Sequence, residues 1–208
     1  MHRTGSMSWR FEVGTATALS VALRCRDELG TPVPPSPDVP PGIAVPARTT
    51  APDAGLAVAW LVWWQLLLDR TAAGMHPDRL PDLRRHVLVP DALELVADGP
   101  LRQLAADAAD RHTADARRAW SPPGDDVRPP PPPFPSSVIR DAVFDTAGRH
   151  HVPAEDLWGG VHRVPGPVGW SAVVRPGCGL MTDQGDVVDE GAQYRFVRAV
   201  LESGIRTD

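Results

Sequence analysis

The sequence predicts an α+β fold, with mainly helical N-terminal and middle parts and a small antiparallel sheet in the C-terminal third. Three observations predict it. Apolar residues recur at helical spacing through most of the first 120 positions. Short apolar segments separated by Pro-Gly and Gln-Gly pairs follow residue 160. Two proline-rich stretches, 31–52 and 121–135, carry eight prolines each and divide the chain.

These divisions predict the domain organisation. Residues 1–127 form a mainly helical part that includes a proline-rich loop at 31–52, residues 128–135 form a polyproline spacer, and residues 136–208 form an α+β part. Proline fixes φ and lacks a backbone donor, so both stretches are expected to be extended surface connectors. A chain of 208 residues suits one hydrophobic core, and we expect the two parts to pack as one unit.

The first part begins with a strand and a helix. Trp9, Phe11 and Val13 alternate with polar neighbours, which is typical of a half-buried strand, and we expect this strand to complete the C-terminal sheet. Apolar positions then recur every three or four residues from Thr15 or Thr17 to Leu29, which predicts a helix.

The middle part contains the strongest pattern in the chain. Asp53 is expected to cap a helix that runs to about Ala73, with Gly74 in a left-handed C-terminal conformation. Residues 56–68 carry no charge and three of the seven tryptophans. The run is shorter than the roughly 20 residues that cross a bilayer, so we expect no membrane span. A helix that is apolar on every side is buried in a core or covered by a partner.

The remaining elements follow from spacing, caps and turns. The expected helices cover a short segment after Asp91 and then 100–120, 136 or 137 to 148, and 190–203. The expected strands are 161–164, 170–174 and 179–181, arranged as an antiparallel meander.

Composition excludes several functions. A formal charge of −5 gives no basic excess for binding nucleic acid. All 21 basic residues are Arg, and the absence of Lys removes a Schiff base and a P-loop lysine. The bias towards Arg indicates a GC-rich bacterial genome. Two cysteines and no apolar leader favour the cytoplasm, and no motif predicts a cofactor.

One cysteine has features of a nucleophile. Cys178 lies between two glycines in a predicted turn, where a thiol can be approached closely. His162 is the candidate base, with Asp183 or Asp186 to orient it. The alternative is that Cys178 is a small buried apolar residue and that its glycines serve the turn.

The late histidines are candidate metal ligands. His150, His151 and His162, with Glu155 and Asp156 between them, have side chains that a divalent ion prefers. Their spacing matches no ligand pattern, and the alternative is a polar helix end.

Two further segments each have a functional interpretation and a competing structural one. Arg79, Arg84 and Arg85 have the chemistry of an anion site, but neighbouring aspartates favour a solvated connector. Residues 128–135 resemble polyproline ligands in composition, and a stiff spacer is the competing interpretation.

Two functional hypotheses result. The favoured one is a non-catalytic partner-binding protein, an adaptor, regulator or immunity-type component of a bacterial multi-protein system. It would bind another protein chain, or a second copy of itself, around Trp60, Trp63 and Trp64, because tryptophan is enriched in interface hot spots. The alternative is a small hydrolase or transferase that uses Cys178 with His162.

Overall fold

The computed structural model describes residues 9–29, 33–42, 53–75, 89–96, 98–119, 134–182 and 189–205. These residues form helices and strands in the order β1 (Arg10–Thr15), α1 (Thr17–Leu29), α2 (Ala54–Met75), α3 (Val89–Glu94), α4 (Pro100–Ala119), α5 (Ser136–His150), the 3-10 helix η2 (Ala154–Asp156), β2 (Trp158–Arg163), β3 (Ser171–Arg175), β4 (Cys178–Met181) and α6 (Glu190–Gly204). The predicted α+β class is confirmed.

The sheet is mixed, so the predicted antiparallel meander is wrong. Its strand order is β1-β2-β4-β3, and only β3 and β4 pair antiparallel. The turn at Pro176-Gly177 brings β4 back between β2 and β3, where it runs parallel to β2. β1 also runs parallel to β2, with Val13 opposite Val161, which confirms that the N-terminal strand completes the sheet.

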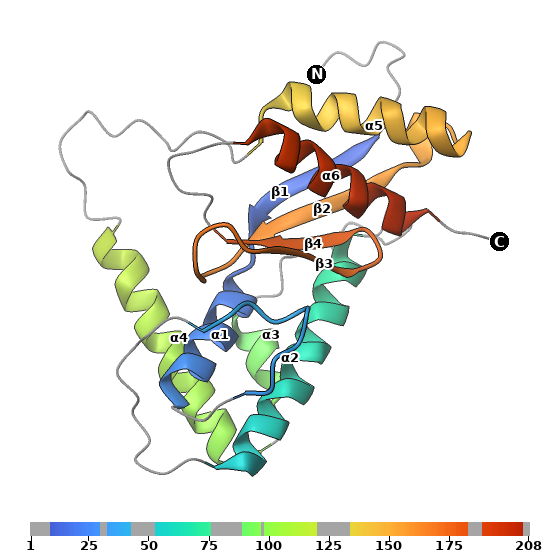
Figure 1. The fold of residues 1–208 in the computed structure, drawn as a ribbon. Helices are drawn as coiled ribbons and strands as arrows, with labels where there is room; N and C mark the ends of the chain where they lie inside the picture. Colours follow the sequence, from blue (N-terminus) through green and yellow to red (C-terminus); the bar gives the residue numbers. More distant parts are fainter. Residues whose placement is uncertain are drawn as a thin grey trace.

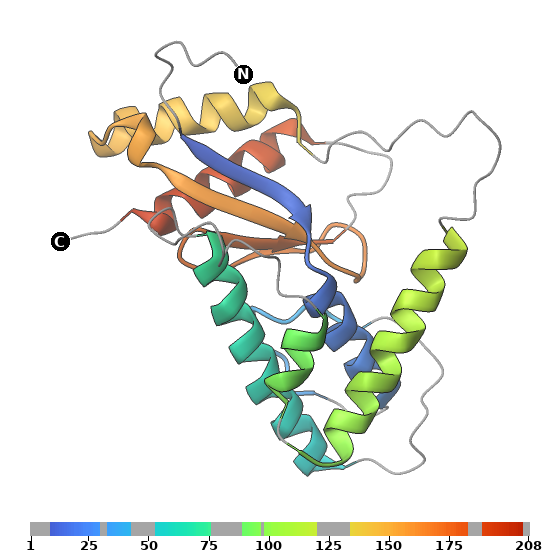
Figure 2. The same ribbon diagram turned by 180° about the vertical axis from the view of Figure 1, so that it is seen from behind.

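The two faces of the sheet are covered by different helices (Figure 1). Helices α5 and α6 lie on one face, and a Cβ atom added at Gly179 would come within 2.7 Å of Val200 in α6. The other face meets the end of α2, where a Cβ atom at Gly160 would lie 2.5 Å from the sulfur of Met75. Helices α1 to α4 extend away from this second face, as Figure 2 shows from behind.

Charged residues join α1 to α4 in the helical part. Glu28 of α1 accepts from Arg24 and from Arg111, and Arg24 also pairs with Asp115. Arg111 and Asp115 thus join α4 to α1, because Glu28 and Arg24 of α1 carry the opposite charges beside them.

Helix boundaries agree with the predictions to within a few residues, and the differences are local. Gly74 lies inside α2 rather than after it. The N-cap of α5 is Pro135, which provides no side-chain hydrogen bond, rather than Ser136 or Ser137. Asp189 caps α6 and accepts from the Ala192 amide at 3.0 Å.

Part of the first proline-rich stretch is packed against helices. Arg26 is buried in α1 and donates to the carbonyls of Pro40 and Pro41. The rest of the stretch, and residues 128–133 of the predicted spacer, lie outside the described residues. The predicted division at 128–135 therefore stays a prediction.

Candidate functional site

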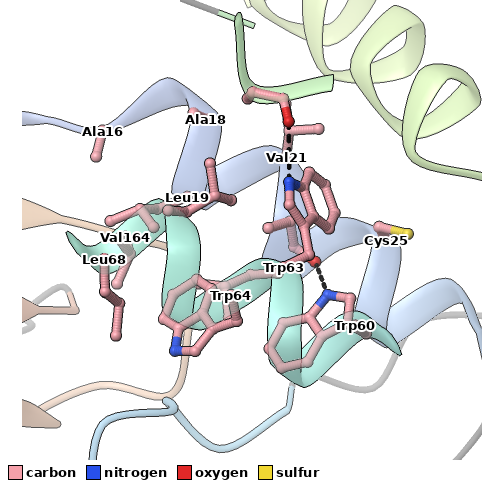
Figure 3. Packing of buried hydrophobic residues seen from close by; sticks show 14 of the residues in the cluster. Ala16, Ala18, Leu19, Val21, Cys25, Trp60, Trp63, Trp64, Leu68 and Val164 are labelled. Atoms are coloured by element: carbon pink, nitrogen blue, oxygen red, sulfur yellow. Dashed lines mark hydrogen bonds between the residues drawn. The ribbon is translucent and has the colours of Figure 1, made fainter. Parts of the chain in front are cut away.

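Trp60, Trp63 and Trp64 lie in the core of the helical part (Figure 3). Their exposed fractions are 0, 1 and 0%. The indole N–H of Trp60 donates to Ala22 O at 2.7 Å, that of Trp63 to Ala92 O at 2.9 Å, and that of Trp64 to Asp38 O at 3.2 Å. Each indole therefore ties α2 to a different segment: α1, α3 and the 33–42 loop.

Two of these rings also contact each other. Trp60 and Trp64 are one helical turn apart, and their rings stack with centroids 5.4 Å apart. The guanidinium carbon of Arg26 lies 5.8 Å from the centroid of the Trp60 ring, which is a cation–π contact. The three tryptophans predicted to bind a partner are thus part of the core of this chain. They offer no accessible surface in this structure, and partner binding at this helix stays a prediction.

The exposed side of α2 is also apolar. Val58, Val62 and Leu66 are exposed by 60, 58 and 43%, and they recur every four residues. Residues at this spacing are about 40° apart around a helix, so they form one continuous row. Gly55 and Ala59 are exposed beside the row. We call Gly55, Val58, Ala59, Val62 and Leu66 the outer face of α2.

The position of α2 in the fold leaves this outer face uncovered by the other helices. In both views α1, α3 and α4 all lie to one side of α2, which stands at the margin of the helical part (Figures 1 and 2). The tryptophans point towards those helices, so the opposite side of α2 faces outwards.

Along α2 and its N-cap, the charged residues are Asp53 before the apolar row and Asp69 and Arg70 after it. At its start Asp53 accepts from the Gly55 amide at 2.8 Å and from the Leu56 amide, as a helix N-cap does. At its end Asp69 pairs with Arg175 of β3, and Arg70 is exposed next to it. Between these ends α2 carries no charged residue.

Cys178 and His162 lie closer together than the sequence indicated. They belong to neighbouring parallel strands, and Cys178 is opposite Gly160 in the register. Gly160 and His162 are two residues apart on one strand, so Cys178 and His162 share one face of the sheet. The expected meander placed them further apart. Asp183 and Asp186, the predicted orienting groups, lie outside the described residues.

The environment of Cys178 is that of a structural thiol. Its side chain has no exposed surface, and it lies in the core with Leu180. Burial raises the pKa of the thiol to about 12, and the charge of Arg175 opposes this only in part. Since the thiolate is the nucleophile, Cys178 is unreactive at neutral pH in this environment. His162 is also buried, at 5% exposure.

The candidate metal ligands occupy separate places. His150 ends α5 on the surface and lies 3.6 Å from Glu202 of α6. His151 follows it in a left-handed conformation, with φ of 55°, as the C-cap of α5. His162 is in the buried strand β2. Among the residues with assigned positions, no group of three His, Cys, Asp or Glu side chains is placed to hold a metal ion.

A polar network at the edge of the sheet was missed by the sequence analysis. Arg175 of β3 donates to Asp69 and Gln65 of α2, and Gln65 donates to Asp38 at 2.9 Å. Burial would raise the pKa of Asp38, but hydrogen bonds from Ser36 and Gln65 outweigh it and lower that pKa. The network fixes the last turns of α2 against the sheet. Its only sequence signal is an arginine in the last position of a strand.

Other predicted segments are not placed. Arg79, Arg84 and Arg85 lie outside the described residues, as does most of 128–135. Of that stretch, Phe134 is buried against α5 and α6. Within the described ranges no helix combines the length and the hydropathy that a bilayer crossing requires.

Comparison of this chain with protein-family models, with curated proteins and with solved structures found no match.

Proposed function

We propose that this chain is a non-catalytic partner-binding protein, an adaptor, regulator or immunity-type component of a bacterial multi-protein system. The outer face of α2 is the proposed contact surface. One observation carries the proposal: Val58, Val62 and Leu66 form an exposed apolar row on a helix whose opposite side already fills the core.

The physical reason is the free energy of exposed apolar surface. Single exposed apolar residues are ordinary, but a continuous row rimmed by charges is typical of protein contact sites. Burial of a valine or leucine side chain contributes roughly 1.5–3 kcal/mol when it is complete. The tryptophans support the surface indirectly, because three hydrogen bonds from their indoles anchor α2 to α1, to α3 and to the 33–42 loop. A rigid surface loses little conformational entropy on binding.

The alternative function, a cysteine-dependent hydrolase or transferase, has one observation in its favour. Cys178 and His162 share a sheet face on neighbouring strands. Their burial and the raised pKa of the thiol oppose a catalytic role. The partner-binding proposal is therefore the better supported of the two.

Site-specific photo-crosslinking tests the proposal. A photoreactive phenylalanine analogue replaces Val58 in one variant and Val168 in a control, since Val168 is exposed by 68% in the loop between β2 and β3. Irradiation in the native host, followed by mass spectrometry, should give a defined adduct from position 58 and none from 168. No adduct at 58, or the same adducts from both positions, would contradict the proposal.

A further inference from the structure

We propose that residues 33–42 form a strap that opens as a unit and exposes Trp64 while the helices beneath it stay folded. The inference goes beyond the proposed function, which concerns the opposite side of α2. It is carried by the contacts that hold these residues and by the partners that remain when the strap leaves.

The strap is held by side chains of other elements rather than by backbone pairing. Figure 1 shows it as a loop that crosses α1 and α2, without helix or strand. Five of its ten residues are proline, which has no N–H to donate. Within the described part of the chain, its one backbone–backbone hydrogen bond is internal, from the Val39 N–H to Ser36 O at 3.1 Å. Release of the strap therefore breaks no hydrogen bond of a helix or a sheet.

Asp38 is the first point of attachment. Its carbonyl accepts from the indole N–H of Trp64 at 3.2 Å, and its carboxylate accepts from Gln65 at 2.9 Å. The guanidinium of Arg175 lies 3.6 Å from the same carboxylate. One residue of the strap thus contacts both α2 and β3.

The second point of attachment follows directly. Arg26 of α1 donates to the carbonyls of Pro40 and Pro41. Val39 and Pro40 are the buried residues of the strap, and Val33 is packed against the core in part. The prolines at 34, 35, 37 and 41 are exposed. The polar contacts with α1, α2 and β3 are therefore confined to a short segment, residues 38–41.

The charged groups that hold the strap keep other partners when it leaves. Arg26 retains its ion pair with Asp27, at 2.6 Å. Arg175 retains its ion pair with Asp69, at 2.5 Å, and it still donates to Gln65, at 2.5 Å. A buried charge that loses its partner is strongly destabilising. Because Arg26 and Arg175 are not left in that state, the free energy of opening is low compared with that of unfolding.

Trp64 differs from its neighbour in this respect. The indole N–H of Trp64 donates to Asp38 of the strap, whereas that of Trp60 donates to Ala22 O within α1. Opening takes away the acceptor of Trp64 and leaves the acceptor of Trp60 in place. Trp64 is fully buried when the strap is closed. A partner that contacts α2 through Trp64 would therefore need the open state.

Hydrogen exchange of the indole N–H groups, followed by NMR on the full chain, tests the proposal. Trp64 should exchange at least about tenfold faster than Trp60, because local opening is enough for Trp64, while Trp60 needs separation of α1 from α2. Equal rates at the two indoles would overturn the proposal, since both would then exchange only when the helical part unfolds.

Asp38→Asn tests the attachment. It removes the charge that Arg175 faces, and it should raise the exchange rate of Trp64 about tenfold or more. The rate of Trp60 should rise less, so that the ratio of the two rates increases.

Asp98→Asn is the matched control, because Asp98 pairs with Arg102 on the surface, away from the strap. It should leave the ratio unchanged. An equal rise at both indoles in Asp38→Asn would show a loss of overall stability without separate opening. That result, or a ratio that Asp38→Asn does not change, would overturn the proposal.

Discussion

Replacement of Trp60 by phenylalanine should destabilise the fold by about 2–3 kcal/mol. The indole is fully buried, and its N–H donates to Ala22 O at 2.7 Å. Loss of that hydrogen bond costs about 1 kcal/mol. The smaller ring leaves part of the space against Trp64 unfilled, which costs about 1–2 kcal/mol more. For a chain of this length the sum corresponds to a fall in Tm of about 4–12 °C.

Urea denaturation followed by circular dichroism measures this change, since tryptophan fluorescence would change with the substitution itself. Val168→Ala is the control, because Val168 is exposed and its truncation should alter the free energy of unfolding by less than about 0.5 kcal/mol. The dependence on urea should be the same for both variants. A loss for Trp60→Phe no larger than that of the control would refute the placement of this indole in the core.

Three more predictions concern other parts of the fold. Gly177→Ala should cost about 2–5 kcal/mol, because the backbone has φ of 68° and the new Cβ would lie 2.4 Å from the Trp158 ring. Gly169→Ala has a similar φ but open space around it, and should cost only about 1–2 kcal/mol in the same urea titration; equal losses would contradict the packing of Trp158. Burial would raise the pKa of Glu28, but hydrogen bonds from Arg111 and Arg24 outweigh it and lower that pKa. A lowered carboxyl pKa stabilises the fold above the unfolded pKa, and this contribution is lost as pH falls through the folded pKa. Glu28→Gln should therefore be less stable than the parent at neutral pH, with a difference that shrinks in acid, and a difference that grew in acid would show that the ion pairs are absent. Finally, Cys178 in a Cys25→Ala variant should react slowly with iodoacetamide at neutral pH and at the rate of a free thiol in urea, because burial raises the pKa of Cys178 to about 12. Fast native alkylation well below pH 8.5 would instead favour the catalytic alternative.

The sequence predicted the helices and strands better than their arrangement. Caps and turns depend on neighbouring residues, so Asp53 and Pro176-Gly177 indicated the start of α2 and the β3–β4 turn correctly. The pairing of β4 with β2 depends on residues far apart in the chain. Short apolar strands such as Cys178–Met181 have the same pattern in parallel and antiparallel sheets. The mixed topology was therefore not predictable from these segments.

The candidate surface was predictable only in part. The run at 56–68 predicted a helix that is apolar on all sides and needs cover, and this helix is α2. Tryptophan is common in interface hot spots, but its large ring also fills a core, and all three rings of α2 do so. The outward residues are the smaller Val58, Val62 and Leu66. Their orientation depends on where α1 and α3 pack, and no local pattern specifies that.

The parallel pairing of β1 with β2 constrains how the chain folds during its synthesis. Arg10 is opposite Trp158 in the register, so among the described residues β1 has no pairing strand until synthesis has passed Trp158. Contacts between such distant positions slow folding, because a long loop must close before they form. A nascent chain halted before Trp158 would present an unpaired strand edge. Such edges recruit other chains, so arrested translation of this protein would favour aggregation.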